Sequence, residues 1–296
     1  MYTYADIHLQ NKQDAFSAMY YYVSSSILSL CGARTGEGII REAVRRAGCE
    51  SGQAQLASLR QAGIKVNLHS LYHCGCDLAA DPRVRSKLIF DEEDRQIWEI
   101  HTCPMADFWN NRDAGKLGSF FCEEFQRARV LAYTEGVGQL NLSRTLTCPN
   151  DNACCFSAYF REANMSPARA KESFAHCDEG YTPPASQPAN ASFDESIRNL
   201  TISIYYRLWE TARERCGQEG VCAVAEGLKQ WAVQAQEALA SQADRTLMPL
   251  NAEFVSKNFP LSVDAASDPA WQSCPDTSAR DLMQALVLTP IAAREV

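Results

Sequence analysis

Two pairs of short segments constrain the fold of this chain most, because alternating apolar and polar residues flank a turn-forming tetrapeptide in each pair. The pairs are 87–90 with 96–101, around Asp91-Glu92-Glu93-Asp94, and 140–148 with 153–160, around Pro149-Asn150-Asp151-Asn152. Each pattern predicts a β-hairpin. The same alternation over residues 64–71 predicts a further strand. Because hairpin strands run antiparallel, we expect an antiparallel sheet and not a parallel one.

Apolar residues at helical spacing stand before and between these predicted strands. We expect helices over 14–30, capped by Asp14, and from Thr35 to Gly48, with Gly48 ending the helix in the left-handed conformation. Further helices are expected over 51–63, 105–111 and 117–135. Helices placed before and between antiparallel hairpins predict an α+β domain over residues 1–180, an antiparallel sheet with packed helices.

The last part of the chain has a purely helical pattern. Residues 181–190 contain Pro183, Pro184 and Pro188, which predicts an extended linker. Beyond it, apolar residues at helical spacing over 193–208 and 221–239 predict two helices that form an antiparallel pair. We therefore expect a helical C-terminal region over 190–296 that packs on the first domain or on a second subunit, which would make a homo-oligomer.

The charge of the chain narrows the classes of partner. Its formal net charge is −8 and it has no basic run, so we expect neither nucleic acid nor an anionic membrane as a partner. The first ten residues lack the basic and apolar regions of a signal peptide, and we expect a cytoplasmic protein. In a reducing compartment its 13 cysteines indicate buried, metal-binding or catalytic thiols and not a disulfide framework.

The nearest approach to a metal motif is Tyr72-His73-Cys74-Gly75-Cys76-Asp77. A Cys-x-Cys pair can supply two zinc ligands, but no second pair follows. We favour buried thiols at a strand end over a metal ion here, and we expect no cofactor. The chain also lacks a phosphate-binding glycine loop and a Gly-x-Ser-x-Gly nucleophile elbow.

The candidate site lies between residues 101 and 160. Cys103 precedes a predicted helix, whose N-terminus lowers the pKa of a thiol. Cys122 lies near the start of the next helix, and Cys154 and Cys155 face opposite sides of one strand. We expect Cys103, Cys122 and Cys154 to converge on one pocket. Each thiol has the alternative of being a small buried apolar side chain.

Two charged side chains are candidates beside these thiols. Arg144 alternates with Leu142 and Leu146, so it requires either an internal ion pair or an anionic group of a substrate. His101, two residues before Cys103, is either a general base or a structural histidine.

Four motifs in this segment resemble one known family. They are Cys103-Pro104-Met105-Ala106-Asp107-Phe108, the stretch 117–123, Arg144-Thr145-Leu146-Thr147 and Cys154-Cys155-Phe156. Together with the glycine-punctuated helices upstream, residues 30–165 resemble the L-2-amino-thiazoline-4-carboxylic acid hydrolase family. Gln126 and Cys155 stand where that family tends to have acidic residues.

The resemblance implies that water opens a 2-amino-thiazoline ring, with a cysteine as the nucleophile. It implies that Arg144 holds the carboxylate of a small-molecule substrate, and that His101 or Glu123 transfers protons. A different hydrolase or lyase, acting on another C–N or C–S bond of a small sulfur-containing amino acid, would differ only in substrate. The alternative from another class is a non-catalytic sensor domain that binds a small ligand or zinc.

Overall fold

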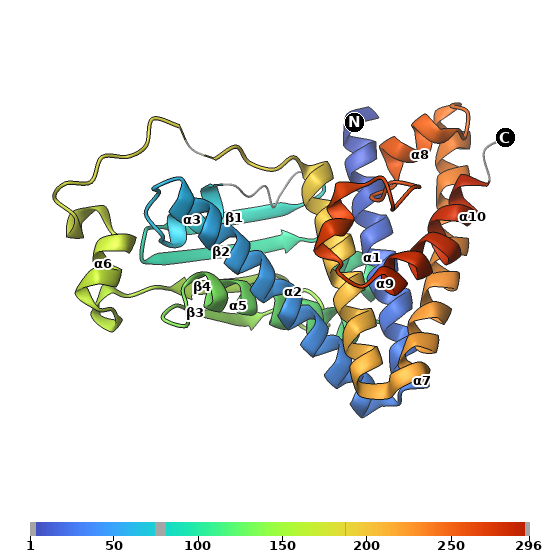
Figure 1. Cartoon of the computed structure of the whole chain (residues 1–296), viewed down its shortest axis with the longest axis horizontal. Coiled ribbons are helices and arrows are strands. Elements are labelled where there is room, and N and C mark those ends of the chain that lie inside the picture. Colours follow the sequence, from blue (N-terminus) through green and yellow to red (C-terminus); the bar gives the residue numbers. More distant parts are fainter. Residues whose placement is uncertain (1–3, 75–80, 187, 294–296) are drawn as a thin grey trace.

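The computed structural model describes residues 4–74, 81–186 and 188–293 (Figure 1). Its strands are β1 (Arg85–Asp91), β2 (Arg95–Thr102), β3 (Gln139–Arg144) and β4 (Cys154–Tyr159). The α-helices before and among the strands are α1 (Tyr4–Leu30), α2 (Ala33–Gln61), α3 (Leu68–His73), α4 (Pro104–Asn110) and α5 (Gly115–Tyr133). Those after the strands are α6 (Pro167–Ser173), α7 (Phe193–Thr246), α8 (Ala252–Asn258), α9 (Thr277–Met283) and α10 (Thr289–Ala292).

The strands form one antiparallel sheet in the order β1-β2-β4-β3. Both predicted hairpins and the α+β class are confirmed. Burial alternates along β4, so Cys154, Phe156 and Ala158 face the protein interior while Cys155 faces the other side. The inner face packs on α2, α3 and α5 in one hydrophobic cluster.

The predicted strand over residues 64–71 is wrong, because this segment turns into α3 at Asn67. The Asn67 side chain accepts a hydrogen bond from the Ser70 backbone N–H (2.9 Å), and Ser70 Oγ accepts one from the Asn67 N–H (3.0 Å). This capping box starts a helix where the apolar alternation predicts a strand. The Leu68 N–H then donates to Glu93 O (2.9 Å), which joins α3 to the β1–β2 turn.

The predicted end of a helix at Gly48 is also wrong, since α2 continues without a break from Ala33 to Gln61. Gly48 and Gly52 are buried where α2 crosses α5. A Cβ atom would lie 2.4 Å from Phe125 O at Gly48 and 2.3 Å from Arg129 O at Gly52. These glycines therefore allow two helices to approach closely.

Helix α1 begins ten residues before the predicted helix over 14–30, so Asp14 lies inside it and does not cap it. Its carboxylate instead forms an ion pair with Arg83 (2.6 Å). Asp14 therefore takes part in an ion pair with a distant segment and not in a helix cap.

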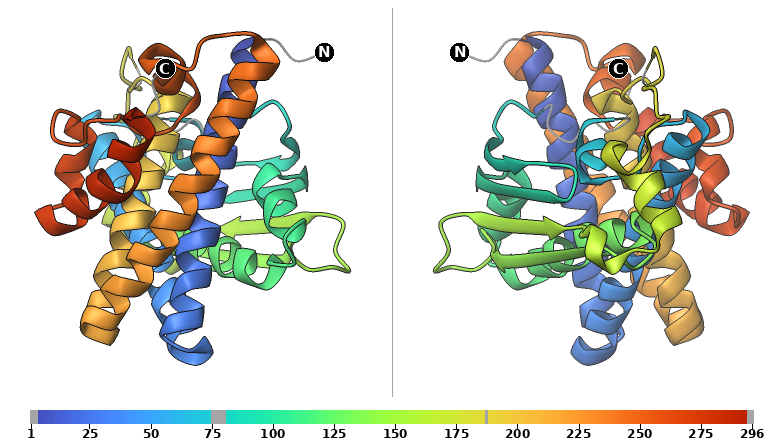
Figure 2. Two further views of the ribbon diagram at one scale, coloured as in Figure 1. Left: turned by 90° about the vertical axis from the view of Figure 1, so that its right-hand side faces the viewer. Right: turned by 90° about the vertical axis from the view of Figure 1, so that its left-hand side faces the viewer.

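Helix α7 contains the predicted antiparallel pair, because the chain reverses at Gly217 (Figure 1). Gly217 has φ 57° and ψ −133°, a conformation that glycine tolerates best. The two halves pack against α1, and a second hydrophobic cluster combines α1, α2, α4 and α5 with α7 and the helices that follow it (Figure 2). The predicted domain boundary lies in the loop before α7, and the division of the chain into two domains stays a prediction.

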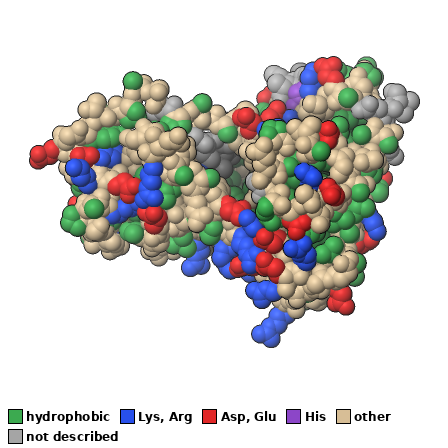
Figure 3. Space-filling model, viewed as in Figure 1, with side chains coloured by type: hydrophobic (Ala, Val, Ile, Leu, Met, Phe, Trp, Pro, Cys, Tyr) green, Lys and Arg blue, Asp and Glu red, His purple; other side chains and the backbone are tan. Residues whose placement is uncertain are grey.

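Basic and acidic side chains are interleaved on the face shown in Figure 3. Ion pairs between helices include those of Arg46 of α2 with Glu210 (3.2 Å) and Glu214 (2.9 Å) of α7. Among the described helices, none is long and apolar enough to cross a membrane.

Candidate functional site

Three of the predicted thiols lie together where the sheet meets α4 and α5. Cys103 follows β2 as the N-cap residue of α4, Cys122 is in the second turn of α5, and Cys154 is the first residue of β4. They are close enough to interact electrostatically: negative charge on Cys154 raises the pKa of Cys103 and of Cys122. The structure thus brings Cys103, Cys122 and Cys154 together, while their catalytic role stays a prediction.

Thr145 lies between two of these thiols, in the loop after β3. Its hydroxyl is 3.7 Å from Cys154 Sγ and also hydrogen-bonds Cys122. The backbone N–H of Leu146 donates to Cys154 Sγ (3.2 Å). The sequence motif contained Thr145, but nothing in its spacing indicated that it would contact two cysteines.

The loop that carries Thr145 is fixed on both sides. The Thr145 N–H donates to Asp151 Oδ2 (2.9 Å). On the side of α5, Gly115 packs so closely on the loop that a Cβ atom would lie 2.5 Å from Thr147 O. The loop therefore holds the hydroxyl of Thr145 in place beside the thiols.

Burial has the largest effect on the pKa of each of the three thiols. It raises the pKa of Cys103 to about 11 and that of Cys122 well above its ordinary value. Burial also raises the pKa of Cys154, although the Leu146 N–H and the Thr145 hydroxyl oppose this. The amides of Ala106 and Met105 at the start of α4 do lower the pKa of Cys103, as the sequence predicts, but burial outweighs them. The thiols are consequently protonated at neutral pH.

His101 and Arg144 are both exposed, and each lies beside a residue of the sheet face opposite Cys154. His101 is exposed on β2, 3.2 Å from Glu99. Glu99 pairs with Cys155 and lies 3.8 Å from its sulfur, on the sheet face opposite Cys154.

Arg144 does not alternate with Leu142 as predicted, because the register shifts between these two residues. This β-bulge places Arg144 opposite Cys155, and its side chain is exposed. An exposed arginine requires no internal ion pair, so that alternative is wrong.

Glu123 also points away from the thiols, into an ion-pair network on the surface. Its carboxylate accepts a hydrogen bond from Arg41 of α2 (2.7 Å), which also binds Glu37 and Glu124. Glu123 lines a groove of about 410 Å³ between α5 and β3. Its effect on Cys122 is electrostatic and raises the pKa of that thiol, after larger effects of burial and the neighbouring thiols.

A family model described as L-2-amino-thiazoline-4-carboxylic acid hydrolase matches residues 9–159. The match covers half of the chain and includes the three thiols and Thr145. The chain belongs to the L-2-amino-thiazoline-4-carboxylic acid hydrolase family. No curated protein and no solved structure matches it. The family match ends at Tyr159, the last residue of β4, so α7 and the helices around it lie outside the part that defines the family.

Other described side chains are arranged so that they could hold a metal ion. Cys76 and Asp77 of the predicted ligand cluster lie outside the described residues, and Cys74 is buried after α3. His73 instead joins His69 and Asp91, and a second group consists of Glu162, His176 and Cys177. The wrong strand prediction concealed the first group. Histidines four residues apart are about 13 Å apart along a strand but neighbours one turn apart on a helix.

Proposed function

We propose that the cluster of Cys103, Cys122 and Cys154 hydrolyses a 2-amino-thiazoline-type ring, with Cys103 as the nucleophile. The observation that carries this proposal is the convergence of three thiols, two of which contact Thr145, in a chain of this family. Cys103 is favoured because it is only half-buried and lies at the N-terminus of α4, whereas Cys154 is buried. Backbone amides there stabilise negative charge on a sulfur atom.

The first step uses a thiol that is protonated at rest. The substrate contains a basic amidine, so its ring nitrogen can take the proton from Cys103 as the sulfur attacks the ring carbon between nitrogen and sulfur. The bond from this carbon to the ring sulfur then breaks, and the ring sulfur leaves as a thiolate. The product of this step is an S-linked isothiourea on Cys103, heavier than the protein by one whole substrate molecule.

The second step consumes one water molecule. Water adds to the same carbon, the bond to Cys103 breaks, and the released thiolate takes up a proton. A urea remains on the nitrogen of the former ring, giving an N-carbamoyl-cysteine type product. The balance is one substrate and one water to one product, with Cys103 restored.

Three side chains are suited to position the substrate. Thr145 can donate a hydrogen bond to the departing sulfur. The side-chain oxygen of Gln126, one helical turn after Cys122, is buried without a hydrogen-bond partner among the described residues, and it can accept from the amino group. Arg144 is exposed directly before Thr145 and can reach a substrate carboxylate.

A second candidate function is a non-catalytic module that binds a small ligand or zinc. The observation that favours it is the exposed group of His69, His73 and Asp91, whose donor atoms lie within 4.8 Å of one another.

The decisive experiment traps the enzyme during turnover. The protein is mixed with 2-amino-thiazoline-4-carboxylate, quenched in acid and measured by intact mass spectrometry and peptide mapping. We expect an adduct of one substrate mass on Cys103, and a loss of turnover of about 10³-fold or more in Cys103→Ala. The matched control is Cys222→Ala, at an exposed cysteine of α7, which should retain full turnover. Undiminished turnover in Cys103→Ala, Cys122→Ala and Cys154→Ala would exclude cysteine catalysis. Absence of turnover in the unaltered protein would favour the binding module.

A further inference from the structure

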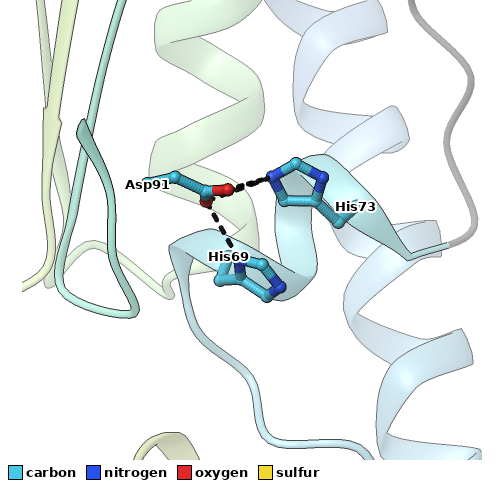
Figure 4. Close-up of side chains that lie close together, drawn as sticks. All are labelled: His69, His73 and Asp91. Carbon is cyan, nitrogen blue, oxygen red and sulfur yellow. Dashed lines mark hydrogen bonds and ion pairs between the residues drawn. The ribbon is translucent and has the colours of Figure 1, made fainter. Parts of the chain in front are cut away.

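We propose that His69, His73 and Asp91 form a site for a divalent transition-metal cation of the zinc class, separate from the thiol cluster (Figure 4). His69 and His73 lie on α3, and Asp91 is the last residue of β1. Asp91 pairs with Gln96 at the start of β2, whereas Cys103 follows the other end of that strand. The two sites therefore lie at opposite ends of β2.

The donor atoms already converge. His69 Nδ1 is 2.9 Å from Asp91 Oδ1, and His73 Nε2 is 3.0 Å from Asp91 Oδ2. The two imidazole rings stack with centroids 4.4 Å apart. Tetrahedral zinc with ligands at about 2.0–2.1 Å separates neighbouring donor atoms by about 3.3 Å. An outward movement of a few tenths of an ångström would thus admit the cation.

The elements that carry the ligands are held rigidly, as a preformed site requires. Besides the capping box at Asn67, the Asn67 side-chain amide donates to Glu93 in the β1–β2 turn (3.1 Å). Tyr133 of α5 donates to Asn67 O (3.1 Å). Helix α3 and the end of β1 are therefore joined by bonds that do not involve the proposed ligands.

A residue outside the proposed ligand set also contacts the Asp91 carboxylate. The Gln96 side-chain amide donates a hydrogen bond to Asp91 Oδ1. This hydrogen bond orients Asp91 from the side of β2, as contacts behind a metal-binding carboxylate do.

The surroundings attract cations. His69 and Asp91 line a pocket of about 410 Å³ whose other walls include Glu92, Glu93, Asp94 and Glu162. This concentration of carboxylates lowers the electrostatic energy of a divalent ion. Three protein ligands would leave a coordination position open to water in the pocket.

The chemistry of the ligands selects the class of ion. Two imidazoles with one carboxylate suit zinc and its first-row neighbours. Calcium and magnesium prefer all-oxygen ligands, so the two histidines disfavour them.

Zinc binding by the full chain tests the proposal, with X-ray absorption at the zinc K-edge to identify the ligands. Because the chain has 13 cysteines, stoichiometry alone would not separate this site from a thiol site. We expect one zinc per chain with nitrogen and oxygen ligands at about 2.0–2.1 Å and scattering from two imidazoles. A first shell of sulfur at about 2.3 Å, or no zinc retained at micromolar concentration, would overturn the proposal. This measurement uses the unaltered protein, so it holds even where a variant folds poorly.

The zinc affinities of variants show where the ion binds. His73→Ala and Asp91→Asn should each lower zinc affinity by at least about tenfold. The matched control is His101→Ala, which removes another exposed histidine paired with an acidic residue and should bind zinc normally. His176→Ala tests the group across the same pocket. If His176→Ala loses zinc while His73→Ala and Asp91→Asn keep it, the ion belongs to Glu162, His176 and Cys177 and the proposed site is wrong.

Discussion

At the scale of single residues, Cys103 shows how burial competes with a helix terminus. The start of α4 supplies amides that favour a thiolate, but removal from water raises the pKa of Cys103 to about 11. Desolvation of a full charge exceeds the stabilisation that a helix end provides. A nucleophile in this setting is inert until a substrate accepts its proton, which limits side reactions with other electrophiles.

This pKa predicts how Cys103 reacts in the free protein. Only the thiolate is alkylated, and below the pKa its fraction rises about tenfold per pH unit. The rate at which iodoacetamide modifies Cys103 should therefore keep rising from about pH 7 to beyond about pH 9, without a plateau. Peptide mass spectrometry after timed quenching measures this rate, with exposed Cys222 as the internal comparison. A plateau near neutral pH would show that Cys103 is a thiolate at rest.

At the scale of elements, the contact between α2 and α5 depends on two glycines. Gly48→Ala should destabilise the protein by about 1–3 kcal/mol, because its Cβ would collide with Phe125 O at 2.4 Å. Gly52→Ala should behave similarly against Arg129 O. Urea unfolding followed by circular dichroism measures both effects.

The matched control lies in the same helix. Gly38 is exposed and has no atom within 4 Å of an added Cβ. Gly38→Ala should stabilise the protein by about 0.5–1 kcal/mol through helix propensity alone. Equal effects at Gly38 and Gly48 would contradict the close-packing role of Gly48.

At the scale of the whole molecule, the part matched by the family shares a core with the helices beyond it. Val23 of α1 is fully buried, and α7 packs so closely on it that a Cβ atom at Gly227 would lie 2.5 Å from Val23 Cα. A fragment of residues 1–186 would expose this face of α1 to water, at a cost of about 1.5–3 kcal/mol for each large side chain.

We therefore predict that the fragment 1–186 does not fold alone. Circular dichroism and size-exclusion chromatography of the fragment should show lost tertiary structure or aggregation, and co-expression with residues 187–296 should restore a soluble complex. Cooperative unfolding of the isolated fragment would instead support two independent domains.

Elements whose signals are local could be predicted from the amino-acid sequence. Alternation around turn-forming tetrapeptides located β1 with β2 and β3 with β4, and Pro104 marked the start of α4. These patterns succeed because neighbouring residues set the direction of strands and the start of helices. The four motifs between residues 103 and 156 also indicated the family.

Features that depend on contacts between distant segments could be seen only in the folded chain. Gly48 lies inside α2, where it packs against α5, and does not end the helix as predicted. A β-bulge places Arg144 on the exposed side of its strand. Contact with the β1–β2 turn helped make α3 a helix, which brought His69 and His73 to one face beside Asp91. Thr145 lies between two thiols because the loop after β3 packs against α5 and β4. Local sequence cannot carry this information, because burial and packing partners arise only when the whole chain has folded.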